Sequence, residues 1–226
     1  MLRMRNYFSP LAQWLCCCFL FVCCMLAARI IYTNNIRYIF LVWNLFLAAI
    51  PYWISMSLYK MILKSKFLQS VFLLCWLVFF PNALYVVTDL IHLTKTTSVP
   101  VWFDAVLLFV SSSLGLVLGF ASLLNVERYL CNYFKTFQVN LIVLSTIFAG
   151  SYGVYLGRFK RWNSWDVVNN PLLLATDILK TFIHPLEHLG VWSVVFLLTG
   201  MYSLSWFLIK VFTAQLNTLK SINPVK

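Results

Sequence analysis

Six long apolar segments constrain the fold of this chain more than any other feature of its sequence. Each has about the 20 residues that an α-helix needs to cross a hydrocarbon core roughly 30 Å thick. Their length and periodicity predict an all-α polytopic membrane helix bundle, a single integral membrane domain over residues 1–226. The expected spans are Leu11–Ala28, Tyr38–Leu58, Phe67–Val87, Val101–Leu124, Val139–Leu156 and Val191–Ile209.

The composition supports this fold class and excludes others. Hydrophobic residues make up 62% of the chain and charged residues 10%, whereas a soluble domain is roughly 25% charged. A soluble globular enzyme, a disordered chain and a disulfide-stapled secreted module are therefore excluded. The net charge of +11 indicates no nucleic-acid partner, because the cations are scattered among the connections, where they anchor spans. Membrane lipid is the expected partner.

The positions of the 17 Lys and Arg residues predict the orientation. Ten lie at the termini and in the second and fourth connections, and seven lie in the others. The positive-inside rule then places both termini in the cytoplasm, in a multi-pass cell membrane protein. The 3–4 and 5–6 connections face outward and, with the start of the fourth span, hold five of the six acidic residues and all three histidines. Because ionisable groups beside a bilayer tend to mark sites, we expect a polar site at the extracytoplasmic face.

The first polar cluster follows Pro81, which we expect to kink or break the third helix. If a helix resumes there, four residues at spacings of three, four and three share one face. Asp89 and His92 then form a candidate acid–base or metal-binding pair. The alternative is a helix end whose polar residues cap and hydrogen-bond. The four residues are Asn82, Tyr85, Asp89 and His92.

Asp104 begins the fourth span and is a further candidate carboxylate. Ser111, Gly115 and Gly119 follow it as a stripe of small residues at spacings of four. Such stripes let helix backbones approach closely. We therefore expect the fourth span to pack tightly against the fifth, with Asp104 pointing into the bundle rather than at lipid.

The third cluster lies where the fifth span leaves the membrane. Arg158 and Arg161 stand about one turn apart and suit an anionic group such as a lipid headgroup. Trp162 and Trp165 fit the interfacial aromatic belt. The alternative is simple anchoring and capping. Asn163 is a candidate substrate contact, and Asp166 a candidate catalytic carboxylate.

Asn170 as N-cap and Pro171 at the first helical position predict a helix over residues 171–182. This helix is too short and too polar to span the membrane, so we expect it on the outer surface. It ends at His184-Pro185-Leu186-Glu187-His188, which matches the H-x-x-E-H pattern of inverted zinc peptidases. Pro185 disfavours the α region at His184 and so spoils the ligand geometry. Zinc held by His92, His184 and His188 stays open as a cofactor hypothesis. The seven cysteines, five of them in the first span, are expected to be small apolar packing residues rather than metal ligands.

Four stretches of this chain resemble a family of bacterial multi-pass membrane proteins called domain of unknown function thirteen-sixty-one. The resemblance supports the architecture and draws attention to the same polar residues, but it carries no activity and attaches no roles to them. The stretches are Trp43–Pro51, Phe80–Leu93, Trp102–Asp104 and Tyr155–Asp166.

The leading hypothesis is an integral membrane enzyme whose outward site processes an anionic lipid or lipid-linked substrate. Asp89, His92, Asp104 and Asp166 are its candidate catalytic residues, and the arginine pair clamps the substrate. A non-catalytic scaffold or envelope-assembly factor, which uses the same residues as a buried polar network, is the second. A small-solute transporter is third, because the ionisable residues avoid the bilayer centre.

Overall fold

The computed structural model describes residues 10–61, 65–93 and 99–222. Over these ranges the protein is all-α, with eight α-helices, two short 3-10 helices and no strand. Their order is α1 (Pro10–Thr33), α2 (Phe40–Met61), α3 (Lys66–Tyr85), η1 (Val86–His92), α4 (Val101–Leu130), α5 (Thr136–Phe159), α6 (Asp166–Asn169), α7 (Pro171–Ile183), η2 (Pro185–His188) and α8 (Leu189–Ile222).

All six predicted spans are confirmed as helices long and apolar enough to cross a membrane, so the protein is of the multi-pass membrane type. The spans are longer than the apolar runs alone indicate. The first extends to Thr33, so Arg29 lies inside α1 rather than in a connection. Some cations used for the orientation prediction, Arg3, Arg5, Lys64, Lys95 and Lys226, lie outside the described residues.

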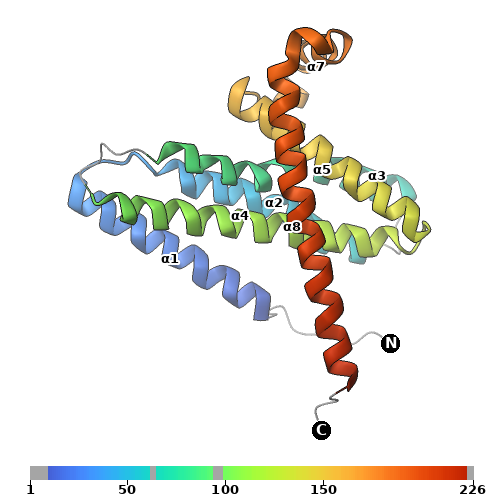
Figure 1. Cartoon of the computed structure of the whole chain (residues 1–226), viewed down its shortest axis with the longest axis horizontal. Coiled ribbons are helices and arrows are strands. Elements are labelled where there is room, and N and C mark those ends of the chain that lie inside the picture. The colour runs from blue at the N-terminus through green and yellow to red at the C-terminus, as the bar shows by residue number, and fades with distance from the viewer. Residues whose placement is uncertain (1–9, 62–64, 94–98, 223–226) are drawn as a thin grey trace. The chain divides into compact units, whose positions relative to one another are not determined.

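The chain divides into two compact units, residues 1–129 and residues 130–226. In the first unit, α1 to α4 lie beside one another (Figure 1). Its core is made of apolar side chains from these helices and from η1. They include Val22 and Leu26 of α1, Leu41 and Leu45 of α2, Ala83 of α3, Val86 of η1, and Leu107 and Leu108 of α4.

The segment after Pro81 differs from the sequence prediction. The proline lies inside α3 without ending it, and the helix continues to Tyr85. Only then does the chain tighten into the 3-10 helix η1. Because a 3-10 helix has three residues per turn, Asp89 and His92 lie on one side of η1, one turn apart. The predicted four-residue stripe along one α-helix is therefore wrong in its geometry.

Close packing of η1 against α4 depends on a glycine. A Cβ built on Gly115 would lie 2.8 Å from the Cβ of Val86 and 3.0 Å from the carbonyl oxygen of Ala83. The Ser112 hydroxyl also donates to the Val86 carbonyl at 3.1 Å. The small-residue stripe thus lets α3 and η1 approach α4, whereas the spacing of the small residues alone predicts the fifth span as the neighbour at this stripe.

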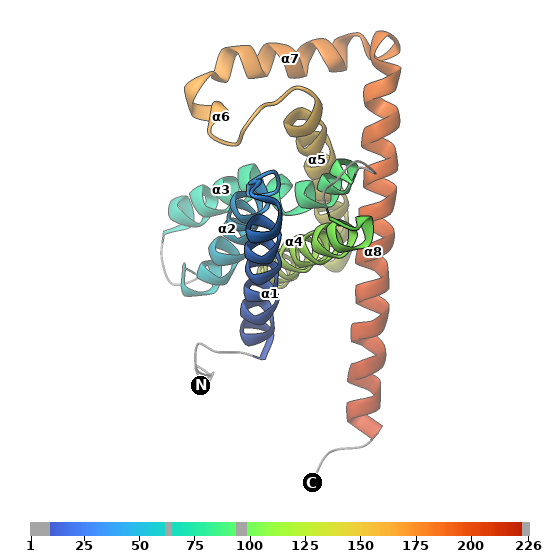
Figure 2. The same cartoon turned by 90° about the vertical axis from the view of Figure 1, so that its left-hand side faces the viewer.

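In the second unit, α5 packs against α8 over a small core of Tyr152, Tyr155, Val191 and Val195. The segment between these two helices contains α6 and α7. Figure 2 shows α7 running across the end of α8, to which η2 joins it. The predicted helix over 171–182 is confirmed, with Asn170 before it and Pro171 at its first position.

Candidate functional site

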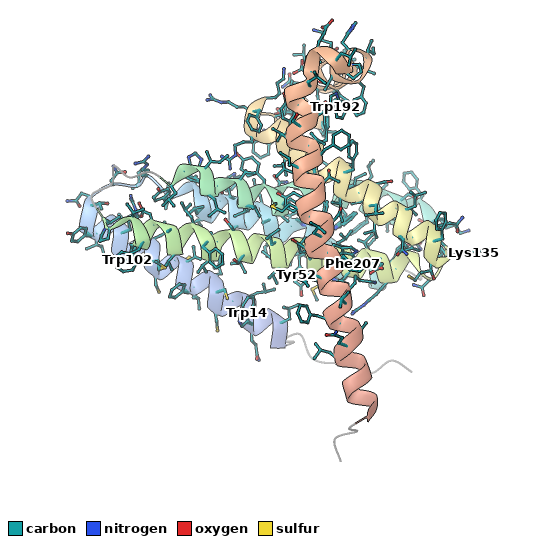
Figure 3. The ribbon with its side chains drawn as sticks, in the orientation of Figure 1. Trp14, Tyr52, Trp102, Lys135, Trp192 and Phe207 are labelled. Atoms are coloured by element: carbon teal, nitrogen blue, oxygen red, sulfur yellow. The ribbon has the colours of Figure 1, made fainter. Side chains whose placement is uncertain are left out.

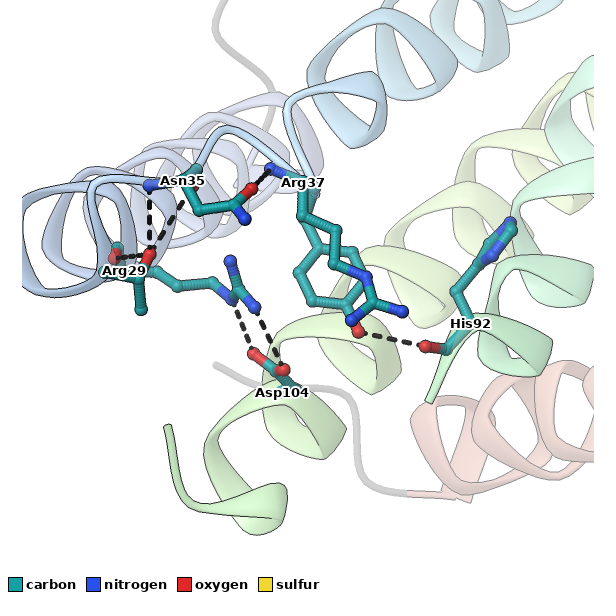
Figure 4. Close-up of polar contacts among 7 residues, drawn as sticks. Arg29, Asn35, Arg37, His92 and Asp104 are labelled. Atoms are coloured by element: carbon teal, nitrogen blue, oxygen red, sulfur yellow. Dashed lines mark hydrogen bonds and ion pairs between the residues drawn. The ribbon is translucent and has the colours of Figure 1, made fainter. Parts of the chain in front are cut away.

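A buried ion pair joins α1 to α4 at one end of the first unit (Figure 4). The Arg29 Nε donates to Asp104 Oδ1 at 2.8 Å, and Nη2 donates to Oδ2 at 3.3 Å. Arg29 is 4% exposed and Asp104 is 0% exposed. Asp104 lies in the first turn of α4, where the helix dipole favours a negative charge. The prediction that Asp104 points inward is confirmed, and its charge is matched by Arg29.

Tyr38 lies beside this pair, in the connection between α1 and α2. The Arg29 guanidinium carbon is 4.5 Å from the centre of the Tyr38 ring, a cation–π distance. Among the described residues, Arg29 Nη1 has no hydrogen-bond partner, so the ring supplies its favourable contact. Burial, and then the nearby Asp104 carboxylate, raise the pKa of Tyr38, an effect that Arg37 and Arg29 partly offset.

The Tyr38 hydroxyl extends the cluster to η1 by donating to the His92 carbonyl at 3.0 Å. The His92 ring packs edge-on against Phe40, with ring centres 5.1 Å apart. Asp89 is fully buried and accepts a hydrogen bond from the Asn44 amide of α2 at 2.8 Å. The end of α1, the start of α2, η1 and the start of α4 thus bring their polar residues together in one cluster, which we call the unit 1 polar cluster: Arg29, Tyr38, Asn44, Asp89, His92 and Asp104.

Two further predicted residues lie in the turn before η1. The Asn82 amide donates to the Phe79 carbonyl at 3.0 Å, and the Tyr85 carbonyl accepts the Thr88 hydroxyl at 2.6 Å. Both contacts are local to the end of α3. Asn82 thus bonds within α3, and Tyr85 accepts a hydrogen bond through its backbone at the start of η1.

In the second unit, the chain turns sharply where α5 ends. Arg161 has a φ of 62°, in the left-handed region that is costly for a residue with a Cβ. The backbone N–H of the next residue, Trp162, donates back to the Leu156 carbonyl at 3.1 Å. Arg158 is half-buried and Arg161 is exposed. The two arginine side chains therefore differ in solvent exposure, although they are only three residues apart in the chain.

Asn163 and Asp166 form a local capping pair. The Asn163 backbone N–H donates to Asp166 Oδ2 at 2.7 Å, and its side-chain amide lies 3.4 Å from the same oxygen. Asp166 is the first residue of α6, so its carboxylate closes the turn that begins this helix. This contact favours the capping alternative over the catalytic role predicted for Asp166.

The helix α7 packs on the second unit through a mixed side, with Ile178 against the core and Phe182 against the Trp192 ring. The Trp162 Nε1 donates to Asp177 Oδ2 at 3.0 Å, and Thr181 is 4% exposed, with its hydroxyl on the Asp177 carbonyl. The opposite side carries large aliphatic side chains that are more than half exposed: Leu172, Leu179 and Ile183. Because apolar residues thus lie on both sides of α7, its exposed aliphatic side chains are suited to contact with lipid at a membrane surface.

The H-x-x-E-H segment does not form an α-helical ligand pair. His184 has φ −115° and ψ 61°, outside the α region as the following proline predicts. Its Nδ1 lies 3.8 Å from Glu187 Oε1, and both side chains are largely exposed. Within the described ranges, no three His, Cys, Asp or Glu side chains lie close enough to share a metal ion. The structure thus offers no support for the zinc hypothesis at His92, His184 and His188.

Sequence reasoning missed three members of the unit 1 polar cluster: Arg29, Tyr38 and Asn44. By its position in the sequence, Arg29 is only a topology signal. Asn44 did carry a signal, because it is a polar amide inside an apolar span. Such residues in a membrane helix usually have a polar partner. The partner itself, Asp89, is 45 residues away in the chain, which no local pattern reveals.

Comparison with known proteins places most of the chain in one family. A protein-family model described as "Protein of unknown function (DUF1361)" matches residues 43–208. No curated protein and no solved structure matches the chain.

Proposed function

Because the chain belongs to the DUF1361 family of proteins of unknown function, we propose its function from its own residues: it binds an anionic lipid or lipid-linked substrate at the extracytoplasmic membrane face. The observation that carries the proposal is the orientation of α7, whose aliphatic side chains Leu172, Leu179 and Ile183 face away from the protein. The helix connects directly, through η2, to a membrane span, so a lipid surface is the natural cover for this side.

The cations beside this helix suit an anionic headgroup. Lys160 and Arg161 are exposed at the end of α5, as is Lys180 on α7. Trp165 is 41% exposed beside them and has the amphipathic ring of an interfacial anchor. An aliphatic surface bordered by cations and tryptophan matches the chemistry of a phospholipid, with the chains against the helix and the phosphate near the guanidinium.

A catalytic role for the protein rests on the unit 1 polar cluster. Asp104 is matched by Arg29, so we assign it a structural role and retain Asp89 and His92 as the candidate acid–base pair. Asp89 is buried and held by the Asn44 amide, which orients its carboxylate. The expected experiment is complementation of a deletion strain, in which Asp89→Asn abolishes rescue while the protein still accumulates in the membrane. Rescue by Asp89→Asn would exclude the catalytic role.

Lipid binding is tested on the purified full chain by native mass spectrometry. Phosphatidylglycerol and phosphatidylcholine with the same acyl chains are added in separate titrations. Arg161→Gly removes the guanidinium, and the turn is preserved because glycine adopts a positive φ without strain. Losing one charge-assisted contact weakens phosphatidylglycerol binding about tenfold, and phosphatidylcholine binding stays unchanged. Lys135→Gln, an exposed cation at the other end of α5, is the matched control. Equal affinity of the native chain for both lipids would contradict the proposal.

A non-catalytic scaffold is the second candidate, and the buried Arg29–Asp104 pair favours it. In that case the polar cluster serves to hold α1 to α4. Substitutions at Arg29, Asp89 and Asp104 then lower stability together, and function is lost only in proportion to the loss of folded protein.

A further inference from the structure

An apolar groove lies between α1 and α4, on residues that the proposed function does not use. Its volume is about 380 Å³, within the range of roughly 300–1,000 Å³ typical of ligand pockets. Trp14, Cys17, Cys18 and Phe21 line it from α1, and Phe109 and Ser113 are among the residues that line it from α4. No charged side chain is among its described lining residues. Trp14 projects from α1 in Figure 3.

Small side chains explain why the groove exists. Leu15, Val22 and Leu26 form the buried row by which α1 packs into the unit 1 core. Cys18 lies between the first two of these on the same side of the helix, since helical neighbours are three or four residues apart. Its thiol is shorter than a leucine side chain, and Ser113 is equally small on α4. Because both side chains are short, they leave space that a longer side chain at either position would fill.

Aromatic rings form the rim of this space. Trp14 is 51% exposed, Phe21 is 49% exposed and Phe109 is 65% exposed. These three exposed rings line the groove together with Cys17, Cys18, Val110, Ser113 and Leu114. A lining of this composition suits an apolar occupant.

We propose that this groove binds one hydrocarbon chain of a membrane lipid. Both α1 and α4 are membrane-spanning helices, so the medium beside the groove is the acyl-chain region of the bilayer. Water is a poor occupant, because a buried water needs two to four polar partners and Ser113 is the one hydroxyl among the described lining residues. A charged headgroup has no counter-charge there.

The length of the groove indicates how much of the chain it holds. Trp14 and Phe21 are seven residues apart, which is about 10 Å along a helix. This is about a third of the hydrocarbon thickness. The groove therefore holds several methylenes of a single chain, and the headgroup lies beyond it. The inference involves the first unit only and stands independently of lipid binding by α7.

The test measures retained lipid by native mass spectrometry, after the full chain is purified from membranes containing a phosphatidylcholine with a diazirine on one acyl chain. The same photolipid is cross-linked, and its adducts are mapped by peptide sequencing. Ser113→Phe and Cys18→Leu fill the groove from opposite walls. Cys24→Leu is the matched control, because Cys24 is exposed on the same helix and does not line the groove.

The acyl chain comes from hydrocarbon rather than from water, so its retention depends on packing contacts with the groove walls. Side chains that fill the groove remove these contacts, and both filling variants are therefore expected to lose the retained photolipid. The native chain and Cys24→Leu each retain one photolipid, with adducts concentrated on residues 14–21 and 109–114. Adducts spread evenly around α1, or full retention by both filling variants, would overturn the inference. So would a stable dimer cross-linked through this face, which would identify a second copy as the occupant.

Discussion

The Arg29 guanidinium and the Asp104 carboxylate, 75 residues apart in the chain, meet in a two-contact ion pair from which solvent is almost excluded. The pair joins the last part of α1 to the first turn of α4. Removing one member of such a pair leaves the other as a buried, uncompensated charge, whereas replacing both with apolar residues does not. The energetics of the pair can therefore be separated from the energetics of helix packing.

Asp104→Ala is expected to lower the free energy of unfolding by about 3–5 kcal/mol, because Arg29 keeps its charge without its partner. The double variant Arg29→Met with Asp104→Leu recovers most of this loss. The measurement is reversible unfolding in detergent, and the single variants Arg29→Met and Asp104→Leu complete the double-mutant cycle. Arg37→Ala, on an exposed neighbouring arginine, is the control and is expected to have little effect. Equal losses for Asp104→Ala and Arg37→Ala would refute a structural role for the pair.

Gly115→Ala is expected to destabilise the protein by about 1–3 kcal/mol, the usual cost of overpacking. The added Cβ would lie 2.8 Å from Val86, so η1 and with it Asp89 must shift. Gly200→Ala is the matched control, because nothing lies within 4 Å of a Cβ at that helical position. The control is expected to be neutral or to stabilise by up to about 1 kcal/mol. Thermal unfolding of the two variants in the same detergent checks the difference.

Trp162→Phe is expected to loosen α7 without unfolding the spans, because it removes the donor to Asp177 Oδ2. A hydrogen bond to a carboxylate at a half-buried position contributes about 1 kcal/mol, so hydrogen exchange in α7 should accelerate about fivefold. Trp165→Phe, at a more exposed indole one turn away, provides the comparison. The prediction fails when both variants change exchange in α7 equally, or when neither does.

Deprotonation of Tyr38 is expected to lower the stability of the protein at alkaline pH. Its pKa is raised above the ordinary value of 10.0, first by burial and then by Asp104. The unfolded chain therefore releases this proton at lower pH than the folded protein, and stability falls as pH rises above 10 toward the folded pKa.

Tyr38→Phe should remove this part of the pH dependence and should also weaken the protein at neutral pH, through the lost bond to the His92 carbonyl. Melting temperatures between about pH 8 and 11 test both effects, with Tyr32→Phe, at an exposed phenol, as the control. A steep alkaline loss that persists unchanged in Tyr38→Phe would assign it to another group.

Local features of the chain were predictable where the physics is local. A run of apolar residues long enough to span a bilayer must satisfy its backbone hydrogen bonds internally, so it forms a helix whatever its neighbours do. Asn170 and Pro171 likewise mark the start of α7 through their own backbone preferences. Pro185 alone accounts for the non-helical His184.

The path of the chain after Pro81 was not predictable in the same way. A proline in a helix breaks or kinks it unless surrounding contacts compensate, and here α3 continues to Tyr85. The compensating contacts come from α4. Val86 packs directly against Gly115, and the Ser112 hydroxyl donates to the Val86 carbonyl. Tertiary packing thus decided where the α-helix gives way to the 3-10 helix.

By itself, then, the sequence determined that the chain is helical, which segments can cross a membrane, and that α7 lies outside them, because apolar length and backbone preferences act within a few residues. Only the tertiary structure decided that Asp104 is neutralised by Arg29, that Asn44 holds Asp89 and that α7 leaves several large aliphatic side chains exposed. These outcomes depend on which helix faces meet. A side chain's partner follows from packing between distant segments, and no spacing along one segment encodes it.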